Sequence, residues 1–264
     1  MELADTSHIE WTDSTWNPTT GCSKVSPGCK NCYAERLAGR LKLMGNPKYK
    51  HGFDFTIQPA ALDLPLKWKE PRKIFVNSMS DLFHEMMPDY YLRRCFEVME
   101  EASQHTYQIL TKRPERMLRF AESYGSIPDH IWLGTSCEMA LYKKRIDLLR
   151  RVHVKTRFVS FEPLLGPIGE VNLEGISWAI VGGESGPHHR PIEKEWVREL
   201  RKQCVANKVA FFFKQWGGAT PKAGGRVLDG KTWDQYPETV PSYSGRPVKI
   251  LVQTHTTKKN YSVR

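Results

Sequence analysis

With 264 residues, of which 40% are hydrophobic and 26% charged, the chain is large enough to bury one sizeable core. Eight Trp, ten Tyr and eleven Phe exclude an intrinsically disordered chain, and no apolar run is long enough for a membrane-spanning helix. The first residues, MELADTSHIEWTD, have neither the basic nor the apolar segment of a secretory signal, so we expect a cytoplasmic protein.

The net charge of the chain is +10, and such a field attracts polyanions, including nucleic acids. Many basic proteins bind no anion specifically, so the charge alone leaves the partner open. Residues 240–264 contain no acidic residue and five basic ones, Arg246, Lys249, Lys258, Lys259 and Arg264. This basic tail is either a segment that contacts phosphate groups or a solvated end.

Short apolar runs alternate with helical patterns along most of the chain. The expected strands are a first one just before Cys22 and then 74–76, 107–110, 131–133, 157–159, 178–181 and 210–213. Apolar spacings of three and four predict helices at 88–103, from Pro114 onwards, at 138–151 and at 192–207. Strands that alternate with helices are typical of parallel sheets with right-handed crossovers.

About seven such steps predict an α/β fold, a complete or partial parallel (β/α) barrel over residues 1–216. Beyond Gly217 the pattern gives way to GGATPKAGGRVLDG, which is rich in turn-forming residues. We therefore expect residues 217–264 to form an irregular appendage to the barrel and not a second domain.

The predicted strands end in small or ionisable residues. The six ends read NSMSD (77–81), TKR (111–113), GTSCE (134–138), SFE (160–162), GGESG (182–186) and KQW (214–216). Ligands of parallel α/β folds bind at the carboxyl ends of the strands. Six polar ends on one side of the sheet therefore predict a single polar pocket.

Six cysteines in a chain without an export signal are typical of metal ligands or catalytic thiols, not of disulfides. Three of them, Cys22, Cys29 and Cys32, lie within eleven residues. The two-residue gap between the second and third lets both sulfurs face one metal, and a Pro-Gly turn can bring the first one back. Lys24 and Lys30, together with a helix expected to begin near Cys32, should favour thiolates.

Two metal centres are compatible with this loop. A structural zinc site has four ligands, usually in two pairs. The fourth would have to come through a tertiary contact from Cys95, Cys137, Cys204, His8 or His51. Three thiolates with an open corner favour a [4Fe–4S] cluster that leaves one iron free for a substrate or cofactor. A role for the thiols without metal is the third alternative.

The cysteine loop and its surroundings resemble known families at two levels. Three closely spaced cysteines after a first strand, followed by a βα barrel, resemble the radical S-adenosylmethionine (SAM) superfamily. More narrowly, the chain is similar to a phage- and prophage-encoded three-cysteine-motif family of largely unassigned function. The similar segments are IEWTDSTWNPTTGCSKVSPGCKNCYAERLA, VNSMSDLFHE, LTKRPERM, LGTSCE, SFEPLLGPI, VGGESG and FFKQWG. Where the superfamily usually has C-x3-C-x2-C with an aromatic before the third cysteine, this chain has a first gap of six residues and Asn31.

The superfamily resemblance implies a [4Fe–4S] cluster on Cys22, Cys29 and Cys32. It also implies SAM on the open iron, where one-electron reduction yields a 5′-deoxyadenosyl radical. A flavodoxin- or ferredoxin-like electron donor is implied too, and the narrower resemblance implies a partner protein encoded nearby.

Residue roles follow from the resemblance by position. The candidate SAM-binding residues are Ser78, Ser80, Asp81, Ser136, Glu138, Gly182 and Gly183. The candidates for positioning the substrate or supplying protons are Lys112, Arg113, Glu162, Glu184 and Lys214. Asp81 is the expected partner of the SAM ammonium group, because a carboxylate supplies a charge-assisted hydrogen bond. Asp81 could equally cap the following turn, and Lys112 and Arg113 could form a solvated loop.

Three functions compete at this point. The first is a radical SAM enzyme that acts on a nucleic acid or nucleotide. The second is a zinc-stapled nucleic-acid-binding protein without catalysis. The third is a metal-independent hydrolase that uses Glu162 and Glu184 as general acid and base.

Overall fold

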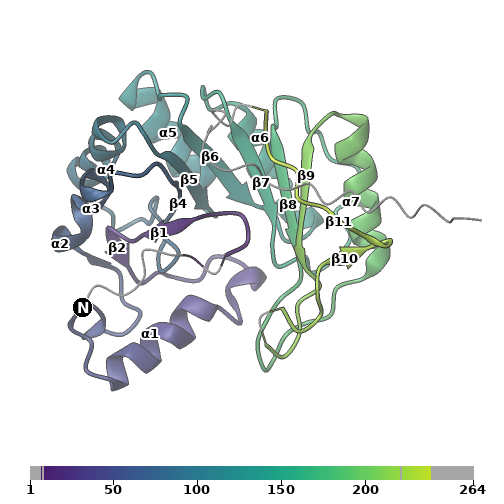
Figure 1. The fold of residues 1–264 in the computed structure, drawn as a ribbon, viewed down its shortest axis with the longest axis horizontal. Coiled ribbons are helices and arrows are strands. Elements are labelled where there is room, and N and C mark those ends of the chain that lie inside the picture. Colours follow the sequence, from purple (N-terminus) through teal and green to yellow (C-terminus); the bar gives the residue numbers. More distant parts are fainter. Residues whose placement is uncertain (1–6, 8, 221, 239–264) are drawn as a thin grey trace, which may run out of the picture.

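The computed structural model describes residues 7, 9–220 and 222–238. Seven strands pair in the order β1-β4-β5-β6-β7-β8-β9, and every pairing is parallel. The strands are β1 (Ser14–Trp16), β4 (Lys73–Val76), β5 (Thr106–Thr111), β6 (Ile131–Ser136), β7 (Arg157–Phe161), β8 (Trp178–Gly182) and β9 (Ala210–Gln215). The sheet is curled into a half-barrel (Figure 1). The chain thus has an α/β fold that agrees with the predicted partial barrel.

Helices follow most of the strands. They are α1 (Tyr33–Leu43), α2 (Pro59–Leu62), α3 (Leu64–Lys67), α4 (Asp89–Glu101), α5 (Pro114–Tyr124), α6 (Lys144–Arg150) and α7 (Lys194–Ala206). Figure 1 shows α4, α5 and α7 outside the curved sheet, and α1 apart from them on the side where the half-barrel is open. A two-residue strand β2 (Thr19–Thr20) pairs with β3 (Thr56–Ile57) and leads into the cysteine segment.

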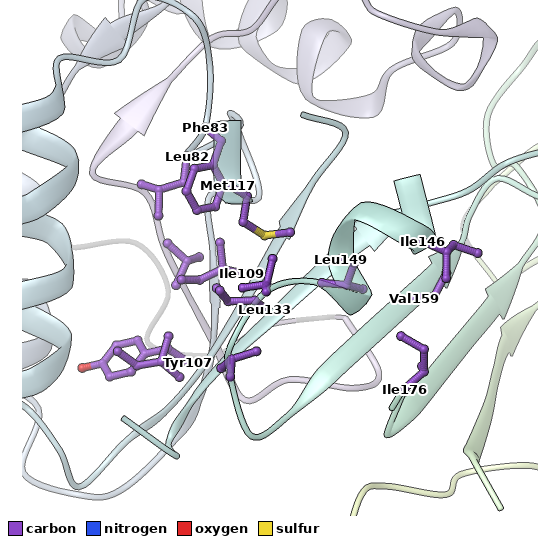
Figure 2. Packing of buried hydrophobic residues seen from close by; sticks show 14 of the residues in the cluster. Leu82, Phe83, Tyr107, Ile109, Met117, Leu133, Ile146, Leu149, Val159 and Ile176 are labelled. Atoms are coloured by element: carbon purple, nitrogen blue, oxygen red, sulfur yellow. The ribbon is translucent and has the colours of Figure 1, made fainter. Parts of the chain in front are cut away.

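The strands are apolar on both faces, as expected of a parallel sheet with covered faces. The outward residues join the helices in the main core; Figure 2 shows Met117 of α5 beside Ile109 and Leu133 of the sheet. The inward residues form a second cluster that consists mostly of large aromatic rings, Trp11, Phe75, Trp132, Phe158, Trp178, Ile180 and Phe212. These rings fill most of the interior below the carboxyl ends of the strands, where Gln108 is a buried polar residue among them.

One predicted helix differs from the structure, and one connection between strands has no helix. The helix expected at 138–151 is a 3-10 turn (Ala140–Tyr142) followed by the short α6, because Glu138 is fully buried in the mouth and the helix begins only after it. The connection between β7 and β8, residues 162–177, contains no helix. Its two prolines and three glycines explain why it remains irregular.

The chain after Gly217 packs against the last strand. A hairpin of β10 (Val227–Leu228) and β11 (Lys231–Thr232) leads to Gln235, whose backbone oxygen accepts from Trp178 Nε1 at 2.8 Å. The Tyr236 ring stacks on Trp178 with centroids 5.1 Å apart. The described part of the predicted appendage is therefore joined to the barrel core, whereas the basic tail, 240–264, lies outside the described residues.

A search of the helices among the described residues finds no candidate with the length and apolar character needed to span a bilayer.

Candidate functional site

The three clustered cysteines lie on one loop, residues 21–32, which we call the cysteine loop. It begins at Gly21, which has φ +80° and donates its backbone N–H to Met79 O at 2.9 Å. A Cβ at Gly21 would come within 2.1 Å of Asp54 O, so only glycine fits where the loop passes the backbone of Asp54. The backbone N–H of Cys22 donates to Phe53 O at 3.0 Å, which holds the loop against the same segment.

Arg113, after β5, attaches the start of the cysteine loop to the sheet. Its Nη1 lies 3.0 Å from Asp81 Oδ2 and 3.5 Å from Cys22 Sγ, and its Nη2 donates to Ser23 Oγ at 2.7 Å. Its Nε donates to Glu85 Oε2 at 2.8 Å. The guanidinium thus binds a sulfur, two carboxylates and a hydroxyl at once, which fixes the position of Cys22.

Asp81 is saturated by contacts within the chain. One carboxylate oxygen accepts from Phe83 N (2.9 Å) and Thr111 Oγ1 (2.7 Å), and the other accepts from Lys112 N (3.2 Å) and Arg113. Asp81 is also 6% exposed. The structure therefore gives this carboxylate the capping and bracing role considered above as the alternative to a contact with the SAM ammonium.

The middle of the cysteine loop is held by Glu138, after β6. This fully buried carboxylate accepts from Ser26 Oγ of the loop and from Arg145 Nη1 at 2.8 Å. A Cβ at Gly28 would come within 2.8 Å of Glu138 Oε1, so Gly28 lets the loop approach this closely. Glu138 therefore packs directly beneath the segment that carries Cys29.

Glu184, after β8, holds the end of the same loop. Its Oε2 accepts from Asn31 Nδ2 at 2.9 Å and from Arg190 Nε at 2.9 Å, and Arg190 also reaches Pro27 O at 3.0 Å. Burial alone would raise the pKa of Glu184, but the hydrogen bonds from Arg190 and Asn31 outweigh it and hold that pKa below its usual value. Asn31, which stands where the superfamily has an aromatic residue, thus connects the end of the cysteine loop to Glu184.

A further ion pair in the mouth joins Glu162 and Lys214. Glu162 Oε1, at the end of β7, lies 3.1 Å from Lys214 Nζ on β9, and the two side chains are 14% and 22% exposed. Ser160 Oγ donates to the other oxygen of Glu162 at 3.3 Å. Neither charge of this pair bonds to the cysteine loop within the described part of the chain.

Tyr33, directly after Cys32, belongs to the same part of the mouth. Its hydroxyl donates to Ser78 O, and the ring is half exposed. Enough protein surrounds the hydroxyl that desolvation, and then the charges of Cys32 and Glu162, raise the pKa of Tyr33. No role for Tyr33 could be assigned from sequence, because only the fold brings it near Glu162.

The other predicted SAM-binding residues are also used within the chain. Ser80 Oγ donates to Gly21 O at 2.6 Å, Ser78 Oγ lies 3.2 Å from Asn17 Oδ1, and Ser136 is 1% exposed. The space left by Gly182 and Gly183 is filled by protein: a Cβ there would meet Glu162 Oε1 at 2.6 Å and Trp216 O at 2.0 Å respectively. These residues shape the mouth and the entry to the cysteine loop.

All three loop cysteines are free thiols that are partly accessible. Cys95, Cys137 and Cys204 are buried, and His51 is exposed on the surface. Among the described residues, no three His, Cys, Asp or Glu side chains converge as a site for a metal ion. This holds for the three thiols of the cysteine loop as well, so it favours neither zinc nor a cluster. His8 lies outside the described residues.

The electrostatics at Cys22 differ from the expectation of lysine-stabilised thiolates. Burial, and then the charge of Asp81, raises the pKa of Cys22 to about 11 despite the opposing contact with Arg113. Lys24 is 2.8 Å from Glu35, so its charge is offset. Cys22 is therefore a poor nucleophile at neutral pH.

Ser23 and His84 are in hydrogen-bond contact but do not form an activated nucleophile. His84 Nδ1 accepts from Met86 N at 3.2 Å, which leaves the ring proton on Nε2, 2.9 Å from Ser23 Oγ. Ser23 in turn donates to Glu85 Oε1 at 2.6 Å. Since the imidazole donates to the hydroxyl, it cannot act as the base that removes the Ser23 proton.

Arg145 and Arg190 are the residues that sequence reasoning missed. Each follows a strand-end glutamate by six or seven residues, and each pairs with that glutamate in the structure. An arginine shortly after an otherwise unexplained glutamate was the available signal, but such pairs are common on solvated surfaces.

Comparison with known proteins gives one result. A search of the curated proteins and a search of the solved structures found no match. A family model matches residues 6–237, which is most of the chain and includes the cysteine loop and all seven strands of the sheet. The chain therefore belongs to the family described as "Protein of unknown function (DUF5131)".

Proposed function

We propose that this protein is a radical SAM-like iron–sulfur enzyme that acts on a nucleic acid or nucleotide. The observation that supports it is the cysteine loop: three partly accessible thiols are held at the mouth of a parallel half-barrel by residues from the ends of β5, β6 and β8. A [4Fe–4S] cluster on Cys22, Cys29 and Cys32 would leave one iron for SAM, whose reductive cleavage supplies a 5′-deoxyadenosyl radical.

The chain's own residues have separate tasks in this proposal. Arg113 donates to the Cys22 sulfur and stabilises negative charge on it. Asp81, Glu138 and Glu184, each paired with an arginine, hold the loop in position. These pairs keep the thiols in a fixed arrangement before any ligand arrives.

Glu162 and Lys214 are assigned to the ligand itself. With Asp81 saturated, Glu162 is the carboxylate in the mouth that is free to accept from the ammonium group of SAM. Lys214, on the neighbouring strand, can donate to a carboxylate or phosphate oxygen. The Tyr33 hydroxyl, which donates its proton to Ser78 O, can accept from the same ligand, because it lies near Glu162.

The substrate class rests on charge. A net charge of +10 and the basic tail favour a polyanion over a neutral or cationic substrate. The reduction requires an electron donor of the flavodoxin or ferredoxin type, which we include in the proposal as a partner.

The test begins with anaerobic purification and analysis of iron, acid-labile sulfide and zinc. We expect iron and sulfide in cluster stoichiometry, and 5′-deoxyadenosine when the reduced protein is incubated with SAM. Cys29→Ala should abolish both. Stoichiometric zinc without sulfide would favour the nucleic-acid-binding alternative, and a hydrolytic activity that survives in Cys29→Ala would favour the hydrolase.

A further inference from the structure

A cleft opens beside the cysteine loop and is lined in part by Arg113 and Arg145, two arginines of the contacts that hold the loop. It has a volume of about 370 Å³ and lies between that loop and the segments that follow β5 and β6. Its lining residues are Val25, Lys112, Arg113, Glu115, Leu141, Tyr142, Lys144 and Arg145. Ligand pockets in proteins usually measure about 300–1,000 Å³, and the volume of this cleft lies within that range.

The cations of the cleft fall into two kinds. Arg113 and Arg145 are nearly buried, and their guanidiniums are committed to Asp81 and Glu138. Within the described residues, the ammonium groups of Lys112 and Lys144 form no ion pair. These two lysines are therefore available to an anionic ligand, and they outnumber Glu115, the acidic residue of the lining.

Apolar side chains lie exposed next to these lysines. Leu141 is 79% exposed and Val25 is 41% exposed, although both are aliphatic. The Tyr142 ring is covered on one side by the Arg145 guanidinium, 4.2 Å from its centroid. Free cations beside exposed apolar surface match a ligand that carries phosphate and a flat apolar group, which is the composition of a nucleotide.

We infer that this side cleft binds one nucleotide of a single-stranded nucleic acid, with its phosphates on Lys112 and Lys144 and its base against Leu141 and Val25. This inference rests on the proposed function and names the form of its substrate. In a duplex the bases are stacked inside, so an enzyme that acts on a nucleotide needs a single strand or an extruded base. A strand held here would pass directly beside the mouth.

The test measures binding of a fluorescein-labelled, mixed-sequence 20-nucleotide single strand, DNA and RNA in turn, by fluorescence anisotropy over a series of salt concentrations. Each phosphate contact to a single strand contributes about 0.7 to the slope of log K against log salt. In the double variant Lys112→Gln/Lys144→Gln, the magnitude of this slope should be smaller by about 1.4, because two phosphate contacts are lost.

A matched control removes two exposed lysines elsewhere, Lys202→Gln/Lys231→Gln on α7 and β11. It changes the net charge equally and should leave the slope at the wild-type value. Leu141→Ser should weaken binding several-fold at every salt concentration without changing the slope, because it removes an apolar contact and no cation. An unchanged slope in the Lys112/Lys144 variant, or a duplex that binds as tightly as the strand, would overturn the inference.

Iron and sulfide are measured on the same samples, which separates this inference from the proposed function. A protein without a cluster whose strand binding still depends on Lys112 and Lys144 contradicts only the proposed function. A protein that carries the cluster but binds the strand independently of both lysines contradicts only the side cleft.

Discussion

Three carboxylate–arginine pairs connect the cysteine loop to the ends of the sheet: Asp81–Arg113 and Glu138–Arg145, which are nearly buried, and Glu184–Arg190, whose arginine is 28% exposed. Removing one partner from such a pair leaves an uncompensated buried charge, which is far more harmful than the pair itself is stabilising. The position of the thiols is therefore tied to the stability of the mouth as a whole.

Gly21 is the first residue whose replacement tests this account. Gly21→Ala should lower the free energy of unfolding by about 3 kcal/mol or more. The new Cβ would collide with Asp54 O, and the alanine backbone would have to adopt φ +80°. Gly45→Ala is the control: its φ is +72° but nothing lies within 4 Å, so it should cost only about 1 kcal/mol. If urea denaturation gave the same decrease in the free energy of unfolding for both variants, the close approach of Gly21 to Asp54 O would be contradicted.

Glu162 is the residue that tests the assignment of its ion pair with Lys214 to the ligand. Glu162→Gln should retain the cluster and raise the KM for SAM about ten-fold or more, because a charge-assisted hydrogen bond is lost. Its free energy of unfolding should also fall, because the side chains of the pair are only 14% and 22% exposed and the Lys214 charge loses its partner. Glu174→Gln, which breaks the exposed pair with Arg150, serves as the control, and an unchanged KM in Glu162→Gln would refute the assignment.

At the scale of the elements, the sheet could be predicted from sequence because each strand is an apolar run that ends in polar residues. The helix pattern was less informative after β6. There, burial of Glu138 by Arg145 and Ser26 delays the helix until Lys144, and this tertiary contact leaves no local signal. The hairpin of β10 and β11 was not predicted for another reason: its Gly-rich surroundings are typical of an irregular segment.

The segment after this hairpin should contribute to the core. Tyr236→Ala should lower the free energy of unfolding by about 2 kcal/mol, because the ring packs against Trp178 and Phe212. Tyr90→Ala, at a side chain that is 71% exposed, should change it by less than about 0.5 kcal/mol. If both variants unfolded at the same urea concentration, the end of the described chain would have no part in the barrel.

At the scale of the whole molecule, the position of the polar strand ends beside the cysteine loop was predictable, but the partner of each side chain there was not. The cysteine spacing and the polar strand ends pointed to the mouth of the barrel. Which carboxylates are saturated and which are open depends on Arg113, Arg145 and Arg190, whose partners are chosen by the fold. Asp81 and Glu162 look alike in sequence, and only their surroundings distinguish them.

Global stability should decrease in mild acid. His105 is 1% exposed, and its Nδ1 accepts from Arg72 N at 3.2 Å, so its neutral form is required. Burial, opposed by its bond to Pro65 O, lowers the pKa of His105 below the unfolded value of about 6.5. The unfolded chain therefore binds more protons, and the free energy of unfolding should fall by up to about 1.4 kcal/mol per pH unit as the pH drops below about 6.5.

His105→Asn keeps an acceptor for Arg72 N–H and cannot be protonated. Its free energy of unfolding, measured by urea denaturation at several pH values, should depend less on pH than that of the wild type. An identical pH dependence in the two proteins would show that His105 is not the group responsible.

The central claim is that three thiols of the cysteine loop hold an iron–sulfur cluster with one open iron. Electron paramagnetic resonance of the anaerobic, reduced protein tests it most directly, with and without SAM and with Cys29→Ala as the control. We predict a reduced-cluster signal that changes when SAM is added and is missing in the variant. A wild-type spectrum without a cluster signal, or one that SAM leaves unaltered, would contradict the account.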